Sequence, residues 1–245
     1  MIRLDRYLVT LGRGSRSVLQ KEIRAGRVTV DGSVTRDPGF SCREGAAIAL
    51  NGESLDTRLA RHVLLHKPAG LLTAARDKKQ PTVMDLLPAE YASLGCMPVG
   101  RLDKDTTGLL LLTTDGELNH RLLAPGRHVD KTYLAHVNGP LNGSHTAAFA
   151  AGLSLGDFTA APADLVILSS GPSESVARVT VHEGKFHQIK RMFEAVGLTV
   201  TRLHRESFGP LVLGDTPPEG RWRELTEEEL RALYAAAAMN TEPEA

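Results

Sequence analysis

A run of four leucines behind a polar loop constrains the fold more than any other stretch of this 245-residue chain. Loop and run together read VGRLDKDTTGLLLLTTDG, residues 99–116. A short apolar run bounded by turn residues is typical of a buried strand. We therefore expect a core strand that begins directly after a loop carrying Asp103 and Asp105. Those two carboxylates either cap the turn or perform chemistry.

The composition is that of a globular protein, with 42% apolar and 24% charged residues. No apolar run approaches the ~20 residues needed to span a membrane. The N-terminal stretch alternates charged and apolar residues, unlike a signal peptide. Cys42 and Cys96 are too few for a zinc site or a disulfide framework. We expect a cytoplasmic protein with one large domain or a small domain followed by a larger one.

Basic residues are concentrated in two places although the net charge is zero. Residues 1–36 hold eight Lys or Arg against three acids, and residues 185–205 hold five against one. Because salt screens charges beyond ~10 Å, a polyanion responds to such local patches. An alternative is a solvated helix face, the usual role of charged runs. We favour RNA binding, and the candidate RNA-binding residues are Arg3, Arg6, Arg16, Lys21, Arg24 and Arg27.

The first 50 residues show the signals of a small module. Apolar residues of IRLDRYLVTLG recur at helical spacing, and a second helix is predicted from the N-cap Ser15 to Gly26. Asp31-Gly32 and Asn51-Gly52 are hairpin signals between short strands. This pattern resembles the αL RNA-binding module of a small-subunit ribosomal protein, which many RNA-modifying enzymes share. We place this domain at 1–53 and a linker at 54–61.

A larger domain is predicted over 62–238, followed by a disordered tail at 239–245. Strand patterns fall on 62–67, 71–74, 109–113, 131–137, 163–170, 175–183 and 198–209, and helix patterns on 82–87, 117–125 and 186–197. A capping box of Thr226 and Glu229 opens a last helix. Helices do not alternate strictly with strands. We therefore expect an α+β fold with a mixed, largely antiparallel sheet and flanking helices.

Three interpretations of the 103–107 loop compete. Its Asp and Thr side chains could simply bond their own backbone before a core strand. Its D-x-D-x-T pattern also fits the nucleophile loop of haloacid-dehalogenase-type phosphatases. That loop should follow a strongly apolar strand and needs a later acidic pair for magnesium, whereas Asp215 has no acidic neighbour.

The third interpretation accounts for more of the chain. GRLDKDTTGLLLLTTDG, KTYLAHV, EGKFHQIKRMFEAVG and RLHRESFGPL occur in order and resemble the motifs of pseudouridine synthases, in particular the RsuA-type branch (the RsuA, RluB, RluE and RluF family). The resemblance covers residues 1 to about 233. It implies an isomerase, an rRNA pseudouridine synthase, with Asp103 as the catalytic aspartate.

The chemistry is consistent with such a site. Conversion of uridine to its C-glycoside breaks the C1′–N1 bond, turns the base and joins C5 to C1′. The oxidation state does not change, so we expect no cofactor and no metal. The reaction needs a carboxylate beside the sugar, as a nucleophile or an aid to proton removal. A nearby cation would keep that carboxylate ionised in a pocket.

The resemblance also implies roles for other residues. Lys190 would pair with Asp103, with Arg191 as the alternative partner. Tyr133 would stack on the uracil and could take a proton from the sugar, and Ile189 would line the other side of the base. Arg101 would fill the space that the extruded nucleotide leaves. His187 and Gln188 would hold structure or RNA backbone.

The motif variants are closest to the branch that acts on small-subunit (16S) rRNA. A large-subunit rRNA substrate remains the alternative within the family. A non-catalytic RNA-binding ribosome-assembly factor is the alternative of another class. The expected partner is ribosomal RNA, free or in a partly assembled small-subunit particle, and the expected state is a monomer.

Overall fold

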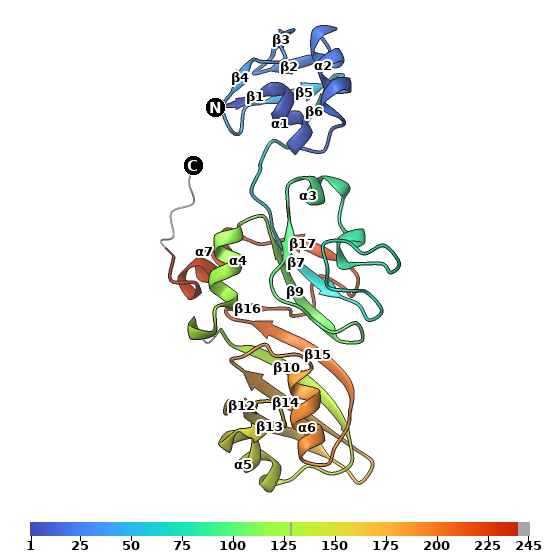
Figure 1. The fold of residues 1–245 in the computed structure, drawn as a ribbon, viewed down its shortest axis with the longest axis vertical. Coiled ribbons are helices and arrows are strands. Elements are labelled where there is room, and N and C mark those ends of the chain that lie inside the picture. Colours follow the sequence, from blue (N-terminus) through green and yellow to red (C-terminus); the bar gives the residue numbers. More distant parts are fainter. Residues whose placement is uncertain (128, 240–245) are drawn as a thin grey trace. The chain divides into compact units, whose positions relative to one another are not determined.

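The computed structural model describes residues 1–127 and 129–239, so most of the predicted tail lies outside the described residues (Figure 1). The chain divides into two compact units. The first comprises residues 1–61 with residues 87–97, and the second residues 62–86 with residues 98 onward.

The first unit contains two helices and a small antiparallel sheet. Helices α1 (Leu4–Thr10) and α2 (Arg16–Arg24) precede the strands β2 (Val28–Val30), β3 (Ser33–Thr35), β5 (Ile48–Leu50) and β6 (Glu53–Ser54), in the order β3-β2-β5-β6. β1 (Ile2–Arg3) pairs with β4 (Ser41–Cys42). Asp31 and Gly32 both have positive φ, +48° and +81°, which a two-residue hairpin turn requires. The helices and hairpin predicted from the sequence are therefore present.

Residues 87–97 interrupt the second unit in chain order, but they pack as part of the first unit. Their helix α3 (Ala89–Ser93) contacts α1. Leu94 packs on the core of the first unit. Gly12 allows the close approach, because a Cβ there would lie 3.1 Å from the Cα of Glu90. No pattern in the sequence indicated this excursion.

The second unit is built on a nine-stranded sheet with the main order β13-β14-β10-β15-β9-β7-β17. Its strands are β7 (His62–Lys67), β9 (Thr107–Thr113), β10 (Lys131–Asn138), β13 (Asp164–Ser170), β14 (Glu174–Val181), β15 (Val200–Phe208) and β17 (Trp222–Glu224), with β8 (Met97–Pro98) on β9 and β16 (Leu211–Val212) on β15. Along the main order only β9 and β15 are parallel. The predicted α+β fold with a mixed, largely antiparallel sheet is confirmed.

Helices cover this sheet in two pairs (Figure 1). α4 (Gly116–Leu123) and α7 (Glu227–Ala236) bury leucines against Leu109 and Leu111 of β9. α5 (Gly143–Ala151) meets α6 (Gln188–Ala195) through Phe149 and Phe193, whose ring centroids lie 4.9 Å apart. β11 (Leu153–Ser154) and β12 (Thr159–Ala160) form a small separate ribbon. In the described part of the chain no helix is long and apolar enough to cross a membrane.

One strand expected in this unit is absent, and one expected helix is of the 3₁₀ type. Residues 71–74 form no strand but a single bridge between Leu72 and Thr82, because the neighbouring polar groups bond elsewhere. Gly70 N donates to Lys104 O at 2.7 Å, and the Thr73 hydroxyl donates to Leu102 O at 2.8 Å. The helix expected at 82–87 is a 3₁₀ turn, Val83–Leu86.

Candidate active site

A buried lysine holds the loop that carries Asp103. Lys67, at the end of β7, is fully buried, and its Nζ donates to the carbonyls of Pro68, Asp103, Lys104 and Thr106 at 2.9–3.2 Å. Burial removes the Lys67 ammonium from water, and this desolvation lowers the pKa of Lys67 to about 8. An ammonium among carbonyl oxygens fixes the loop backbone, and therefore the direction in which the Asp103 side chain leaves it.

The next contact sets where β9 meets β15. At Gly108 φ is +107°, and a Cβ would lie 2.3 Å from the carbonyl oxygen of Arg205. Only glycine permits this approach of the two parallel strands. The glycine before the four leucines thus brings the Asp103 loop beside the β15 side chains.

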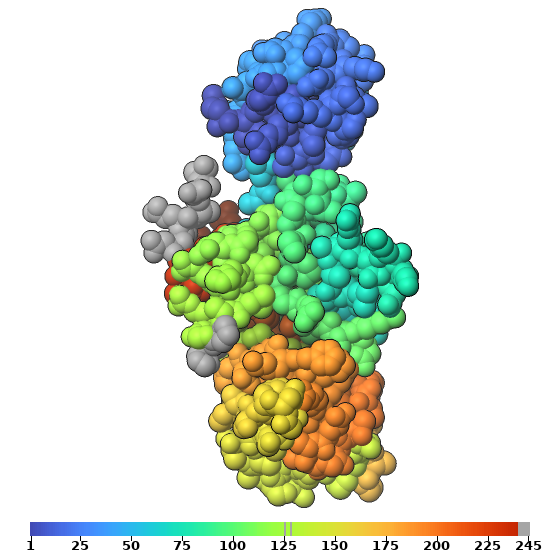
Figure 2. Space-filling model, in the orientation of Figure 1, coloured from blue at the N-terminus to red at the C-terminus, as the bar shows by residue number. Residues whose placement is uncertain are grey.

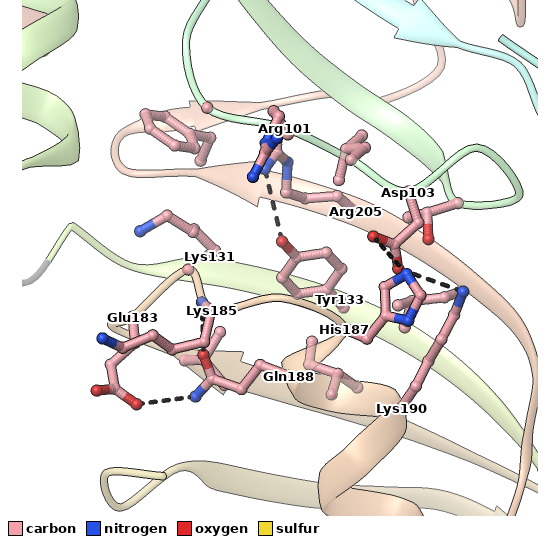
Figure 3. A pocket seen from close by; sticks show the side chains of 18 of the residues that line it. Arg101, Asp103, Lys131, Tyr133, Glu183, Lys185, His187, Gln188, Lys190 and Arg205 are labelled. Atoms are coloured by element: carbon pink, nitrogen blue, oxygen red, sulfur yellow. Dashed lines mark hydrogen bonds and ion pairs between the residues drawn. The ribbon is translucent and has the colours of Figure 1, made fainter. Parts of the chain in front are cut away.

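Asp103 faces two basic side chains. Its Oδ2 lies 3.2 Å from Lys190 Nζ, and its Oδ1 lies 3.5 Å from His187 Nε2 (Figure 3). The Asp103 side chain remains 24% exposed, so a ligand can reach it. The structure therefore brings together the predicted carboxylate and the predicted ammonium.

Lys190 is shared between two carboxylates. Its Nζ also donates to both oxygens of Asp105, at 2.6 and 2.9 Å. Desolvation alone would lower the pKa of Lys190, but the bond to Asp105 and the charge of Asp103 outweigh it and raise that pKa. The same hydrogen bond from Lys190 lowers the pKa of Asp105. The loop thus holds two anions around one cation.

Helix α6 begins in a conformation that aims its first turn at the loop. His187, its N-cap, has φ +50° and ψ +29°. Gln188 is buried, donates to Glu183 at 3.0 Å and accepts from the backbone N–H of Lys185 at 3.2 Å. Gln188 therefore braces the segment before the helix.

A pocket lies between the loop and α6, with Tyr133 of β10 at its centre (Figure 3). Tyr133 and Ile189 are both buried apart from their pocket-facing surface, at 8% and 5% exposed. Figure 2 shows the surface where the green segment around residue 100 meets the orange segment around residue 190. The predicted site residues that line the pocket are Arg101, Asp103, Tyr133, His187, Gln188, Ile189 and Lys190.

Arg191 is the predicted residue that the structure does not bring to this pocket. Its guanidinium pairs with Asp157 and donates to Leu155 O at 2.7 Å. The expectation that it might substitute for Lys190 was wrong, because one step along α6 turns it away from Asp103. Arg101 lies at the mouth, exposed and without an ion pair to any described residue.

The predicted RNA-binding residues all lie exposed on the first unit, but they differ in their partners: Arg3, Arg6, Arg16, Lys21, Arg24 and Arg27. Buried Asp5 accepts from Arg3 at 3.2 Å and from Arg16 at 3.0 Å. The hydrogen bond from Arg3 contributes most to lowering the pKa of Asp5.

Three functional candidates escaped sequence reasoning. Lys67 holds the loop, and Lys131 and Arg205 line the pocket. Lys67 precedes a Pro-x-Gly turn, and Lys131 opens an alternating strand. In a sequence, lysines at such positions look like surface residues. Their burial follows from tertiary packing, and no spacing rule reports it.

The arrangement suits nucleophilic or acid–base chemistry on a flat ring held against Tyr133. In the described ranges no group of three or more His, Cys, Asp or Glu side chains could hold a metal ion. The site brings the Asp103 carboxylate, the Lys190 ammonium and the Tyr133 ring to one pocket.

Comparison with known proteins agrees with this geometry. Residues 61–195 match the family described as RNA pseudouridylate synthase, and residues 2–48 match the S4 domain. The ribosomal small subunit pseudouridine synthase A of Pseudomonas aeruginosa is 41% identical, covering 94% of this chain and 99% of that protein.

Two further relatives span nearly the same length. A Bacillus subtilis protein named as an uncharacterized RNA pseudouridine synthase is 39% identical over 95% of this chain and 98% of its own. The crystal structure of a pseudouridylate synthase aligns with a TM-score of 0.67 and 33% identity, covering 95% of this chain and all of that one. The chain accordingly belongs to the RsuA-type RNA pseudouridine synthases, isomerases that carry an N-terminal S4 domain.

Proposed function

We propose that this enzyme isomerises one specific uridine of small-subunit (16S) ribosomal RNA to pseudouridine, with Asp103 as the catalytic carboxylate. The observation that carries the proposal is the Asp103 carboxylate at the pocket wall, 3.2 Å from Lys190 and beside Tyr133. The relatives from Pseudomonas aeruginosa and Escherichia coli, 41% and 38% identical, are both named for the small ribosomal subunit.

In this proposal the target nucleotide leaves its stack and enters the pocket. Tyr133 stacks on the uracil, Ile189 lines the other side, and Arg101 occupies the gap in the RNA. Asp103, paired with Lys190, either bonds to the ribose or helps to remove a proton as the base departs. The exposed basic residues of the first unit grip the surrounding RNA. Arg191 acts at most on RNA outside the pocket.

A large-subunit rRNA target is the alternative within the family, because the Bacillus subtilis relative carries no subunit in its name. A non-catalytic assembly factor is the alternative of another class. It gives no reason to keep an ion pair between Asp103 and Lys190 in an open pocket. A monomeric, cytoplasmic enzyme that needs neither cofactor nor metal remains our expectation.

The test is a map of pseudouridine in ribosomal RNA from cells that lack this protein. We expect one small-subunit modification to disappear, to return with the wild-type gene, and to stay absent with Asp103→Asn. The matched control Asp164→Asn changes an exposed aspartate at the start of β13 and should restore the modification. A lost modification in large-subunit RNA would favour the first alternative. An unchanged map in both subunits would refute the ribosomal proposal.

A further inference from the structure

Two buried cations line the pocket beside Tyr133: Lys131 lies across Tyr133 from Asp103, and Arg205 reaches the Tyr133 hydroxyl (Figure 3). Lys131 is 7% exposed and Arg205 is 1% exposed. The Nζ of Lys131 and the guanidinium carbon of Arg205 each lie 5.3 Å from the centroid of the Phe208 ring. Asp103, by contrast, meets His187 and Lys190 at the opposite end of the same pocket.

Neither cation forms an ion pair with a carboxylate of residues 1–127 or 129–239. Lys131 donates to Val129 O at 2.6 Å. Arg205 donates through Nε to Leu109 O at 2.7 Å and through Nη1 to the Tyr133 hydroxyl at 3.5 Å. Its buried Nη2 has no hydrogen-bond partner in the described structure.

The nearest acidic side chains serve other partners. Asp130 bonds to His182 at 2.6 Å, and Glu183 accepts from Gln188 and from the backbone of Ala161, both at 3.0 Å. Burial, reinforced by the charge of Arg205, lowers the pKa of Lys131 to about 8, and the charge of Asp130 opposes this shift without reversing it. Burying an unpaired charge costs several kcal/mol. Buried charges without a partner are found at functional sites, where a bound ligand can supply the opposite charge.

The uracil of a nucleotide held at Asp103 is a ligand that acquires this charge. If the ribose lies beside Asp103 and the ring on Tyr133, the free edge of the base can face Lys131 and Arg205, which line the same pocket. Uracil is neutral as it enters. When the C1′–N1 bond breaks, the bonding electron pair stays with the base and spreads over N1, O2 and O4. If the carboxylate instead added to C6 of the base, the negative charge would again reach O4.

We propose that Lys131 and Arg205 form an anion site that binds the carbonyl edge of the uracil and stabilises the negative charge of the detached base. The inference rests on the proposed pseudouridine synthase activity. The site contributes most where charge develops, so it lowers the barrier more than it tightens binding.

The step balances without another reactant. The C1′–N1 pair leaves with the base, and Asp103 balances the sugar either by bonding to it or by aiding loss of a ribose proton. After the base turns, its C5 forms the bond to C1′, and the carboxylate leaves or the ribose proton returns. The C5 proton is then lost and N1 gains one, which restores neutral pseudouridine.

A backbone phosphate of the target nucleotide is another anion that these cations could hold. The two sources predict different kinetics. A phosphate contact acts in the bound ground state, so its loss weakens RNA binding and lowers the salt dependence of affinity by about one ion. A contact to uracil acts on the chemical step.

The experiment uses full-length enzyme and RNA with either uridine or 4-thiouridine at the mapped target position. We expect Lys131→Met to lower the single-turnover rate at least 100-fold, with the RNA Kd changed less than threefold. In 4-thiouridine RNA the larger, weaker acceptor sulfur replaces O4. This RNA should slow the wild type at least tenfold but barely slow Lys131→Met, because the contact is already gone.

Controls separate this inference from folding and from the proposed function. Lys131→Met should keep or raise Tm, because it removes an unpaired buried charge. Arg205→Lys keeps a cation and should lose less rate than Arg205→Met. Exposed Lys79→Met should behave as wild type.

Wild-type conversion of uridine tests the proposed function by itself. Given an active wild type, equal 4-thiouridine effects in wild type and Lys131→Met would overturn the anion site. An unchanged rate with weaker, less salt-dependent binding would also overturn it and assign the cations to phosphate.

Discussion

At the scale of single residues, the site depends on charges placed where water is scarce. Asp103 keeps a cation at 3.2 Å, but that cation bonds more closely to Asp105. Asp105 therefore positions Lys190 as well as sharing its charge. The sequence identified Asp103 and Lys190 through motifs, whereas the role of Asp105 appears only once α6 lies against the loop.

Replacing Lys190 tests this arrangement. Lys190→Met should lower the single-turnover rate roughly 100-fold or more, because Asp103 and Asp105 lose the cation that holds both carboxylates in place at the pocket. Lys190→Arg should retain most activity, since a guanidinium can still reach both carboxylates. Quench-flow measurement of pseudouridine formation checks both variants. Equal losses in the two variants would show that more than the charge matters at this position.

The buried Lys131 predicts a dependence of stability on pH. Its pKa is about 8 in the folded protein and 10.5 in the unfolded chain. Between those values the unfolded state binds more protons, so folding stability from this group rises with pH. The wild type should therefore gain up to about 3 kcal/mol relative to Lys131→Met as pH rises from 8 to 10.5. Urea denaturation of both proteins across this window measures the difference, and a constant difference would contradict the burial of a charge.

At the scale of elements, the position of the site follows from how β9, β15 and α6 meet. The leucine run predicted β9, the apolar stripe predicted α6, and the alternation in KTYLAHV predicted β10. The strand predicted at 71–74 is absent because its polar groups bond to the Asp103 loop. Helix α5 was not predicted, because its small residues show little periodicity. Local patterns report local elements, but they do not report which backbones approach each other.

Gly108→Ala tests the approach of β9 to β15. An added Cβ would meet the Arg205 carbonyl at 2.3 Å in a backbone region that alanine disfavours. We expect the unfolding free energy to fall by about 2 kcal/mol or more, and we expect activity to be lost. Gly116→Ala is the control, because its Cβ would meet nothing within 4 Å at the start of α4. Thermal unfolding of both variants distinguishes close packing from a general effect of glycine replacement.

At the scale of the whole molecule, one unit carries the basic surface and the other the pocket. Charge clustering and motif order separated these two functions in the sequence. The packing of residues 87–97 on the first unit could not be anticipated, since it depends on contacts with Gly12 and the α1 core. Among the basic residues, Arg27 pairs with Glu22, whereas Lys21 and Arg24 have no ion pair with a described residue.

Lys21 and Arg24 should therefore contribute most directly to RNA affinity. The double variant Lys21→Gln with Arg24→Gln should weaken RNA binding and reduce the slope of log K against log salt by roughly 1.5. Its rate at saturating RNA should stay near wild type, because the pocket is untouched. Arg231→Gln, on α7 of the second unit, is the control. Filter binding over a salt series gives the slopes, and an unchanged slope would mean that α2 does not contact phosphate.

The most direct test of the central claim is single-turnover conversion of the target uridine by purified Asp103→Asn. Asparagine keeps the size of the side chain but removes its charge and basicity. We predict no detectable pseudouridine from this variant, with RNA Kd and Tm close to those of the wild type. Pseudouridine formed by Asp103→Asn at a rate within tenfold of the wild type would contradict the role assigned to this carboxylate.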